Sequence, residues 1–135
     1  MDIQPYVFFE GRCDEALGFY QQALGAKVEM LKRFQDAPDQ SMVDPANAGK
    51  VMHASVRVGD TVFAASDGQC GGQSRFGGFA LTLTVDSEAD AERIFAALAE
   101  GGEVRMPMAG TFFAKRFGML TDRFGIMWMV IHGVP

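Results

Sequence analysis

Residues 25–30 read GAKVEM, and residues 101–106, 76 positions later, read GGEVRM. The same offset aligns Phe19 with Phe95 and Asp14 with Asp90. In both places a helical pattern of apolar residues precedes the glycine, and residues typical of a strand follow it. Glycine is the commonest residue just past the end of a helix. A pattern that recurs at a fixed offset indicates an internal duplication.

The first copy reads as a strand, a helix and three further strands. Apolar residues at 13, 16, 17, 20 and 24 form one face of a helix. Gly59-Asp60 is a typical hairpin turn between two strands, and residues 36–49 read as a loop. The spacing predicts elements at 3–9 (strand), 14–24 (helix), 27–34 (strand), 50–58 (strand) and 61–66 (strand).

The second copy repeats this order. Residues 79–85 alternate between apolar and small or polar side chains, which is typical of a half-buried strand. Ser87 followed by Asp90 predicts the start of a helix that ends before Gly101. Pro107 is expected to separate two of the remaining strands. These strands are predicted at 103–106, 114–121 and 126–131.

Residues 69–78 contain four glycines and read as a linker. The expected organisation is a first module at 1–68, this linker, and a second module at 79–135. A half of this size cannot cover its own sheet well. We therefore expect the two modules to form one compact domain.

The amino-acid composition argues against some classes of function. The 135-residue chain carries a net charge of -5 and has no run of basic residues, which argues against binding nucleic acid. It also lacks an apolar run of the roughly 20 residues that a membrane span needs. The N-terminus has no pattern of a signal peptide, and there are only two cysteines. A cytoplasmic protein is expected.

Several motifs resemble those of PhnB-like proteins. They are PYVFFEG at 5–11 with Glu15-Ala16 and Phe19-Tyr20, MHA at 52–54, Met106-Pro107 with Thr111-Phe112, and FGMLTDRFG at 117–125 with Trp128. PhnB-like proteins belong to the vicinal oxygen chelate superfamily, together with glyoxalase I, bleomycin-resistance proteins, fosfomycin-resistance enzymes and extradiol dioxygenases. The resemblance implies an α+β fold in which two βαβββ modules form a curved mixed sheet around a concave site. It also implies a homodimer.

Metal-dependent members of this superfamily take two ligands from each module, one from its first strand and one from its last. Motif spacing puts three of these four places on Pro5, Ala80 and Met129, and the fourth near residues 64–66. Pro, Ala and Met are poor ligands for a hard divalent ion. We therefore expect no metal and no other cofactor.

Strand parity predicts which residues face the concave site. His53, Ser55 and Arg57 should lie opposite the apolar face of their strand, which is formed by Met52, Ala54, Val56 and Val58. Tyr6, Phe8 and Trp128 should pack under the helices. The residues expected to bind a ligand are Val7, Phe9, His53, Ser55, Arg57, Ala80, Thr82, Arg116, Met127 and Met129. His53 is the best catalytic candidate, because histidine can move a proton near neutral pH; it can also be a structural histidine.

Alternative roles stay open for several other residues. Cys13 lies beside Arg12 at the expected start of a helix, so it is either a reactive thiol or a small packing residue. Glu10 and Asp67 end strands near the site and are either carboxylate bases or ligands, or solvated side chains. Arg116 is expected to face either the cavity or solvent. His132 is expected at the surface.

Three functions stay open at this point. The first is a metal-free protein that binds a small organic molecule in a homodimer. The alternative is a lyase or isomerase with a non-standard metal site or with His53 as acid and base. The third is a domain whose cavity is filled by its own Phe and Met side chains. Some PhnB-like proteins are labelled as ubiquinone-pathway methyltransferases, but no nucleotide-binding glycine turn supports that activity here.

Overall fold

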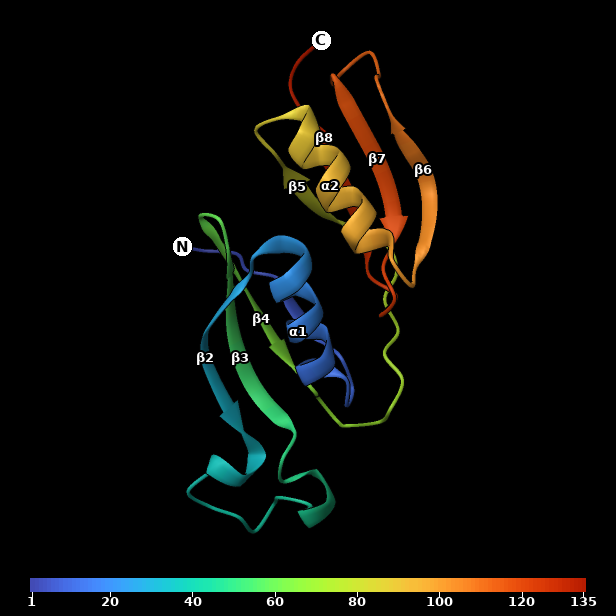
Figure 1. The fold of residues 1–135 in the computed structure, drawn as a ribbon. Helices are drawn as coiled ribbons and strands as arrows, with labels where there is room; N and C mark the ends of the chain where they lie inside the picture. Colours follow the sequence, from blue (N-terminus) through green and yellow to red (C-terminus); the bar gives the residue numbers. More distant parts are fainter. The chain divides into compact units, whose positions relative to one another are not determined.

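The structure, a computed structural model, describes residues 1–135 and divides into two compact units, Met1–Ser74 and Arg75–Pro135. Each unit contains one α-helix and one four-stranded sheet (Figure 1). The order strand, helix and three strands occurs in both units, as the repeated sequence pattern predicts. Each module therefore forms its own sheet.

The first unit contains two short 3-10 helices in the segment predicted to be a loop. Its elements are β1 (Tyr6–Phe8), α1 (Cys13–Leu24), β2 (Lys27–Arg33), η1 (Phe34–Asp36), η2 (Pro45–Asn47), β3 (Val51–Val58) and β4 (Thr61–Ser66). The strand order is β1-β4-β3-β2. β1 pairs with β4 in parallel and the other pairs are antiparallel, so the sheet is mixed.

The second unit has the same topology. Its elements are β5 (Leu81–Thr84), α2 (Glu88–Ala99), β6 (Glu103–Ala109), β7 (Arg116–Thr121) and β8 (Met127–His132). The strand order is β5-β8-β7-β6, with β5 parallel to β8. In each unit the helix packs on one face of its own sheet, and the other face of that sheet is here called its open face (Figure 1).

The helix ends follow the sequence signals. Gly25 ends α1 with a φ of 67°, a left-handed conformation that glycine adopts without a steric penalty. At the start of α2, the Ser87 side chain accepts a hydrogen bond of 3.0 Å from the backbone N–H of Asp90. The start of α1 has no such side chain of its own, because Arg12 at its N-cap accepts no hydrogen bond.

Pro107 does not separate two strands, as the sequence predicts, but lies inside β6. β6 is an edge strand, and its pairing with β7 is irregular between Met106 and Ala109. Proline has no backbone N–H to donate, and it is tolerated at edges and bulges for that reason.

Strand parity is confirmed on β3 and β8. On β3, Ala54 and Val56 are buried while His53, Ser55 and Arg57 are half-buried. On β8, Trp128 and Val130 are buried, and Met127 and Met129 are half-buried. The alternation is lost at the ends of β3. The register between β2 and β3 shifts at Met52, which is exposed instead of lying in the core, while Val51 before it is buried. Val58 at the other end is half-buried.

The predicted faces of β1 are wrong. Val7 and Phe9 are buried, and the ring of Phe9 lies 6.2 Å from that of Tyr20 on α1. Tyr6 and Phe8 are 44% and 48% exposed. A parity count that runs back from α1 to β1 crosses Glu10 and Gly11. Both have positive φ angles, 53° and 117°, and alternation is lost across such a turn.

The two helices are each 12 residues long. Neither is long and apolar enough to span a membrane.

Candidate functional site

The open face of the first sheet collects polar and aromatic side chains. His53, Ser55 and Arg57 alternate with the buried residues of β3, as predicted. Val7 and Phe9, expected on this face, lie on the helix side instead. Their places are taken by Tyr6 and Phe8.

Three rings lie next to one another on this face. The rings of Tyr6 and Phe8 stack with centroids 4.9 Å apart and planes 21° apart. The Tyr6 hydroxyl is 2.7 Å from Nδ1 of His53, and the two rings are 5.4 Å apart. A hydrogen bond at Nδ1 fixes the orientation of the imidazole and leaves Nε2 as the nitrogen that a ligand can meet. We call Tyr6, Phe8 and His53 the ring cluster.

Arg57 does not provide an unbalanced positive charge on this face. Its Nε donates to Oε2 of Glu29 on β2 at 2.9 Å. This hydrogen bond and the charge of Glu29 raise the pKa of the Arg57 guanidinium. The charge of Arg57 is therefore balanced by Glu29, while the exposed Lys27 and Lys32 lie opposite Arg57 and His53 on the same face.

In the second unit, the predicted site residues divide between the two faces. Thr82 is exposed, and it pairs with the half-buried Met129 on the open face. Arg116 lies on the helix side instead. Its guanidinium forms an ion pair with Glu92 of α2 and donates to the carbonyl of Met108 at 3.3 Å. The prediction of a ligand-facing Arg116 is wrong, since this residue shares the parity of Gly118 and Leu120, which are buried.

The strand register also fixes the fourth metal-ligand place of the superfamily. Tyr6 pairs with Ala64 in the first sheet as Thr82 pairs with Met129 in the second. The counterpart of Met129 in the first module is therefore Ala64.

The side chains at the four expected ligand places do not fit a divalent metal. Pro5, Ala64, Ala80 and Met129 offer no hard donor. The structure also contains no group of three or more His, Cys, Asp or Glu side chains that could hold a metal ion.

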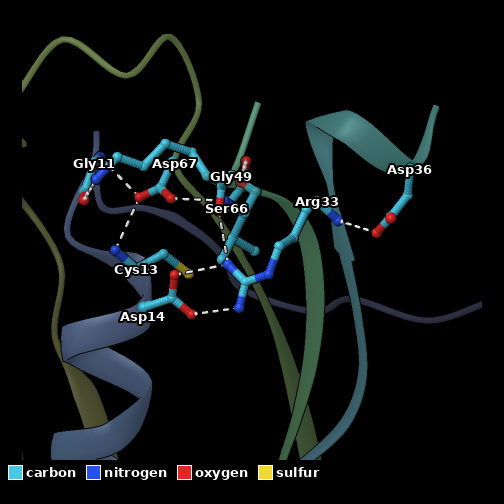
Figure 2. Close-up of polar contacts among 10 residues, drawn as sticks. Gly11, Cys13, Asp14, Arg33, Asp36, Gly49, Ser66 and Asp67 are labelled. Carbon is cyan, nitrogen blue, oxygen red and sulfur yellow. Dashed lines mark hydrogen bonds and ion pairs between the residues drawn. The ribbon is translucent and has the colours of Figure 1, made fainter. Parts of the chain in front are cut away.

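Asp67, which directly follows β4, is fully buried rather than a solvated strand end or an accessible base. Its Oδ1 accepts the backbone N–H groups of Gly11 and Cys13, each at 2.8 Å, and its Oδ2 accepts that of Val51 at 2.8 Å (Figure 2). The carboxylate thus caps the start of α1, which has no cap of its own. A negative charge at a helix N-terminus is stabilised by the helix dipole.

Two further contacts hold the same end of the first unit. Arg33 at the end of β2 binds both carboxylate oxygens of Asp14 on α1, at 2.8 and 3.0 Å (Figure 2). Glu10 accepts the backbone N–H of Gln69 at 3.1 and 3.2 Å. Glu10 is therefore engaged in joining the β1–α1 turn to the segment after β4.

Cys13 is a buried packing residue and not a reactive thiol. Burial, followed by the negative charge of Asp67, raises the pKa of its thiol to about 12. Arg12 does not offset these effects, because it pairs with Glu15 at 2.8 Å. His132, expected at the surface, is half-buried, and its Nδ1 lies 2.8 Å from the carbonyl oxygen of Val85.

Sequence reasoning missed Tyr6, Phe8 and the anchoring role of Asp67. The alternation in PYVFFEG gives two possible faces, and only the geometry of the following turn decides between them. An acidic residue directly after a strand is usually solvated. Three backbone donors that converge on it cannot be read from side-chain identities.

Comparison with known proteins gives a consistent assignment. The family model described as "3-demethylubiquinone-9 3-methyltransferase" matches residues 1–131. Protein YjdN of Escherichia coli is 34% identical over 140 residues, which cover 96% of this chain and 94% of YjdN.

Comparison with solved structures points to the same family and fold. Protein PA1353 from Pseudomonas aeruginosa is 41% identical with a TM-score of 0.81, and the match covers 98% of this chain and 97% of that one. A putative 3-demethylubiquinone-9 3-methyltransferase, PhnB protein, from Bacillus cereus is 25% identical with a TM-score of 0.82 and coverage of 98% and 100%. A glyoxalase/bleomycin resistance protein/dioxygenase family enzyme from Burkholderia phytofirmans, 14% identical with a TM-score of 0.58, shares the fold over 96% of this chain and 94% of its own.

Replacing Asp67 by Asn tests the anchor. The amide keeps one acceptor but turns an N–H₂ group toward a backbone donor, so at least one buried N–H loses its partner. We expect a loss of about 3 kcal/mol in the free energy of unfolding, measured by urea denaturation and circular dichroism. Asp60→Asn in the exposed β3–β4 turn is the matched control, with an expected change within about 0.5 kcal/mol. Equal effects of the two substitutions would contradict the anchoring role.

The raised pKa of Cys13 predicts its reactivity. A thiol with a pKa of about 12 carries almost no thiolate at pH 8. In a Cys70→Ser variant, the folded protein should therefore react with a disulfide reagent at pH 8 only as fast as it unfolds, and one thiol should react at once in denaturant. A fast native reaction that needs no unfolding would show that Cys13 is accessible.

Proposed function

This chain belongs to the family described as 3-demethylubiquinone-9 3-methyltransferase, the PhnB-like proteins with the glyoxalase/bleomycin-resistance fold, and we propose that it binds a small planar organic molecule without a metal. The proposal rests on one observation above all. Two stacked, half-exposed rings lie beside an oriented histidine on the open face of the first sheet.

The ring cluster favours a flat ligand. Aromatic rings pair in stacked or edge-to-face arrangements, each worth about 0.5–1.5 kcal/mol beyond the area that is buried. Tyr6 and Phe8 together offer such a surface, since they are 44% and 48% exposed. A saturated molecule of the same size would lose this part of the binding energy.

The histidine favours a ligand that carries an oxygen. Nδ1 of His53 is engaged by the hydroxyl of Tyr6, so Nε2 is available to donate to, or accept from, a carbonyl or hydroxyl group. A planar ring with an oxygen substituent meets both parts of the ring cluster. Arg57 adds little attraction for an anion, because Glu29 balances its charge.

Absence of suitable ligands supports the metal-free part of the proposal. The four places expected for metal ligands hold Pro5, Ala64, Ala80 and Met129, whose side chains have no hard donor. No metal-dependent step is therefore proposed.

A second function, acid–base catalysis by His53 in a lyase or isomerase, is favoured by the contact between Tyr6 and His53. A hydrogen bond at one ring nitrogen holds the other in place for proton transfer. Methyl transfer, which the family description names, would need a site for a methyl donor, and this sequence has no glycine-rich strand-to-helix turn of the nucleotide-binding kind. We therefore propose binding first and proton transfer second.

We also propose that two copies of the chain associate in the cytoplasm. Large apolar side chains are exposed in both units, and burying them against a second copy is favourable by about 25 cal/mol per Å². They include Met30, Val104, Met106 and Phe113, which lie outside the ring cluster. The two free thiols suit a reducing compartment.

Naphthol binding tests the proposed function. We expect 2-naphthol to bind more tightly than decahydro-2-naphthol, its saturated analogue, in calorimetric titrations. Tyr6→Leu should weaken the binding of 2-naphthol about tenfold, because a stacked ring and the orientation of His53 are lost together. Phe112→Leu is the control, since Phe112 is 94% exposed and lies outside the ring cluster. Equal affinity for the two naphthols, or equal effects of the two variants, would contradict the proposal.

A second experiment separates binding from catalysis. The protein is incubated with an aromatic ketone, and the products are followed by mass spectrometry. No conversion of the ketone is expected if the protein only binds it. Turnover that disappears in His53→Gln while affinity is kept would favour the enzyme instead.

The association of two copies has its own test. The chain has a mass of 14.7 kDa. Light scattering at micromolar concentration should give twice this mass. A mass of 14.7 kDa under the same conditions would contradict the dimer.

A further inference from the structure

The second unit contains a small pocket that shares no residue with the ring cluster. Its volume is about 100 Å³. It lies between the segment that precedes β5 and the turn between β7 and β8. Its lining combines aromatic, thioether and guanidinium groups, from Phe76, Gly77, Phe79, Arg105, Thr121, Gly125 and Met127.

Arg105 is the polar group that the strand geometry directs into this pocket. The register between β6 and β7 shifts between Val104 and Met106, so Arg105 is the extra residue of a bulge. Bulges re-aim the side chain they carry. The Nε of Arg105 donates to Oγ1 of Thr121 at 3.0 Å, which fixes the guanidinium beside the pocket.

The terminal nitrogens of Arg105 keep most of their capacity to bind an anion. The acidic group paired with them is Glu103, whose Oε2 lies 3.6 Å from Nη2, beyond hydrogen-bond distance. Guanidinium groups bind carboxylates through two parallel N–H donors. The nearby negative charge of Glu103 disfavours a dianion such as phosphate more than it disfavours a monoanion.

The rest of the pocket suits a short apolar tail. Phe76 and Phe79 meet edge to face, with centroids 6.4 Å apart. Gly125 has no side chain to fill the space beneath Phe76, since a Cβ there would come within 3.6 Å of the ring. A cavity of about 150 Å³ holds benzene, so about 100 Å³ accepts a chain of a few carbons.

We propose that this pocket binds a small aliphatic monocarboxylate, with its carboxylate on Arg105 and its tail against Phe76, Phe79 and Met127. This site does not rest on the function proposed above. It lies in the other unit and shares no residue with the ring cluster.

Butyrate, its neutral analogue butyramide, and inorganic phosphate are the probes. Backbone amide signals of the full-length protein are followed by NMR at constant ionic strength. Butyrate should give saturable shifts at Thr121, Gly125 and Met127, with a Kd in the range of about 1–10 mM that is typical of a ligand with so few atoms. Butyramide and phosphate should bind at least about tenfold more weakly, because only a monoanion meets both Arg105 and the apolar lining.

Variants test the role of the guanidinium. Arg105→Gln should weaken the binding of butyrate about tenfold or more. Arg93→Gln on α2, which removes an exposed arginine outside the pocket, should leave its affinity unchanged. Unshifted amide signals elsewhere in both variants show that the fold is intact.

Three results would overturn the proposal. They are equal binding of butyrate and butyramide, unchanged butyrate affinity in Arg105→Gln, and no saturation below 50 mM, roughly the weakest affinity that a preformed site of this size should show. Shifts at Thr121 and Gly125 that depend on protein concentration without any probe would overturn it too, because they would place a second copy in the pocket.

Discussion

The buried carboxylate of Asp67 is the constraint on which the first unit depends. It joins three segments that are far apart in the sequence, namely the β1–α1 turn, the first turn of α1 and the start of β3. Each of these contributes one backbone N–H, and a buried charge is tolerated only where such donors surround it. Tyr6 and His53 lie on two of the strands that meet near this anchor, so the register of the ring cluster follows from it.

The sequence predicts the architecture because the same pattern occurs twice. Helix ends at Gly25 and Ser87 follow local capping rules, and the faces of β3 and β8 follow strand alternation. The faces of β1 could not be predicted this way. The left-handed conformations of Glu10 and Gly11 break the count between α1 and β1. The predictions for Arg116 and Asp67 were wrong for a related reason, since the groups that each side chain binds come from other elements.

The two modules share a topology but differ in the chemistry of their sheets. In the first, two aromatic rings lie beside an oriented histidine. In the second, threonine and methionine side chains share the open face, and a bulge directs Arg105 toward a small pocket. Neither module has a hard donor at the places expected for metal ligands, which hold Pro5, Ala64, Ala80 and Met129. Membership of the family and the fold thus defines where a site can lie, and the residues there decide its chemistry.

The central claim is that the first sheet recognises an organic ring through Tyr6, Phe8 and His53 without a metal. The most direct measurement compares the Kd for 2-naphthol before and after exhaustive treatment with a chelator, with metal content measured in both samples. The account predicts the same Kd in both samples. Loss of binding after chelation, restored by one equivalent of zinc, nickel, iron or manganese, would contradict it.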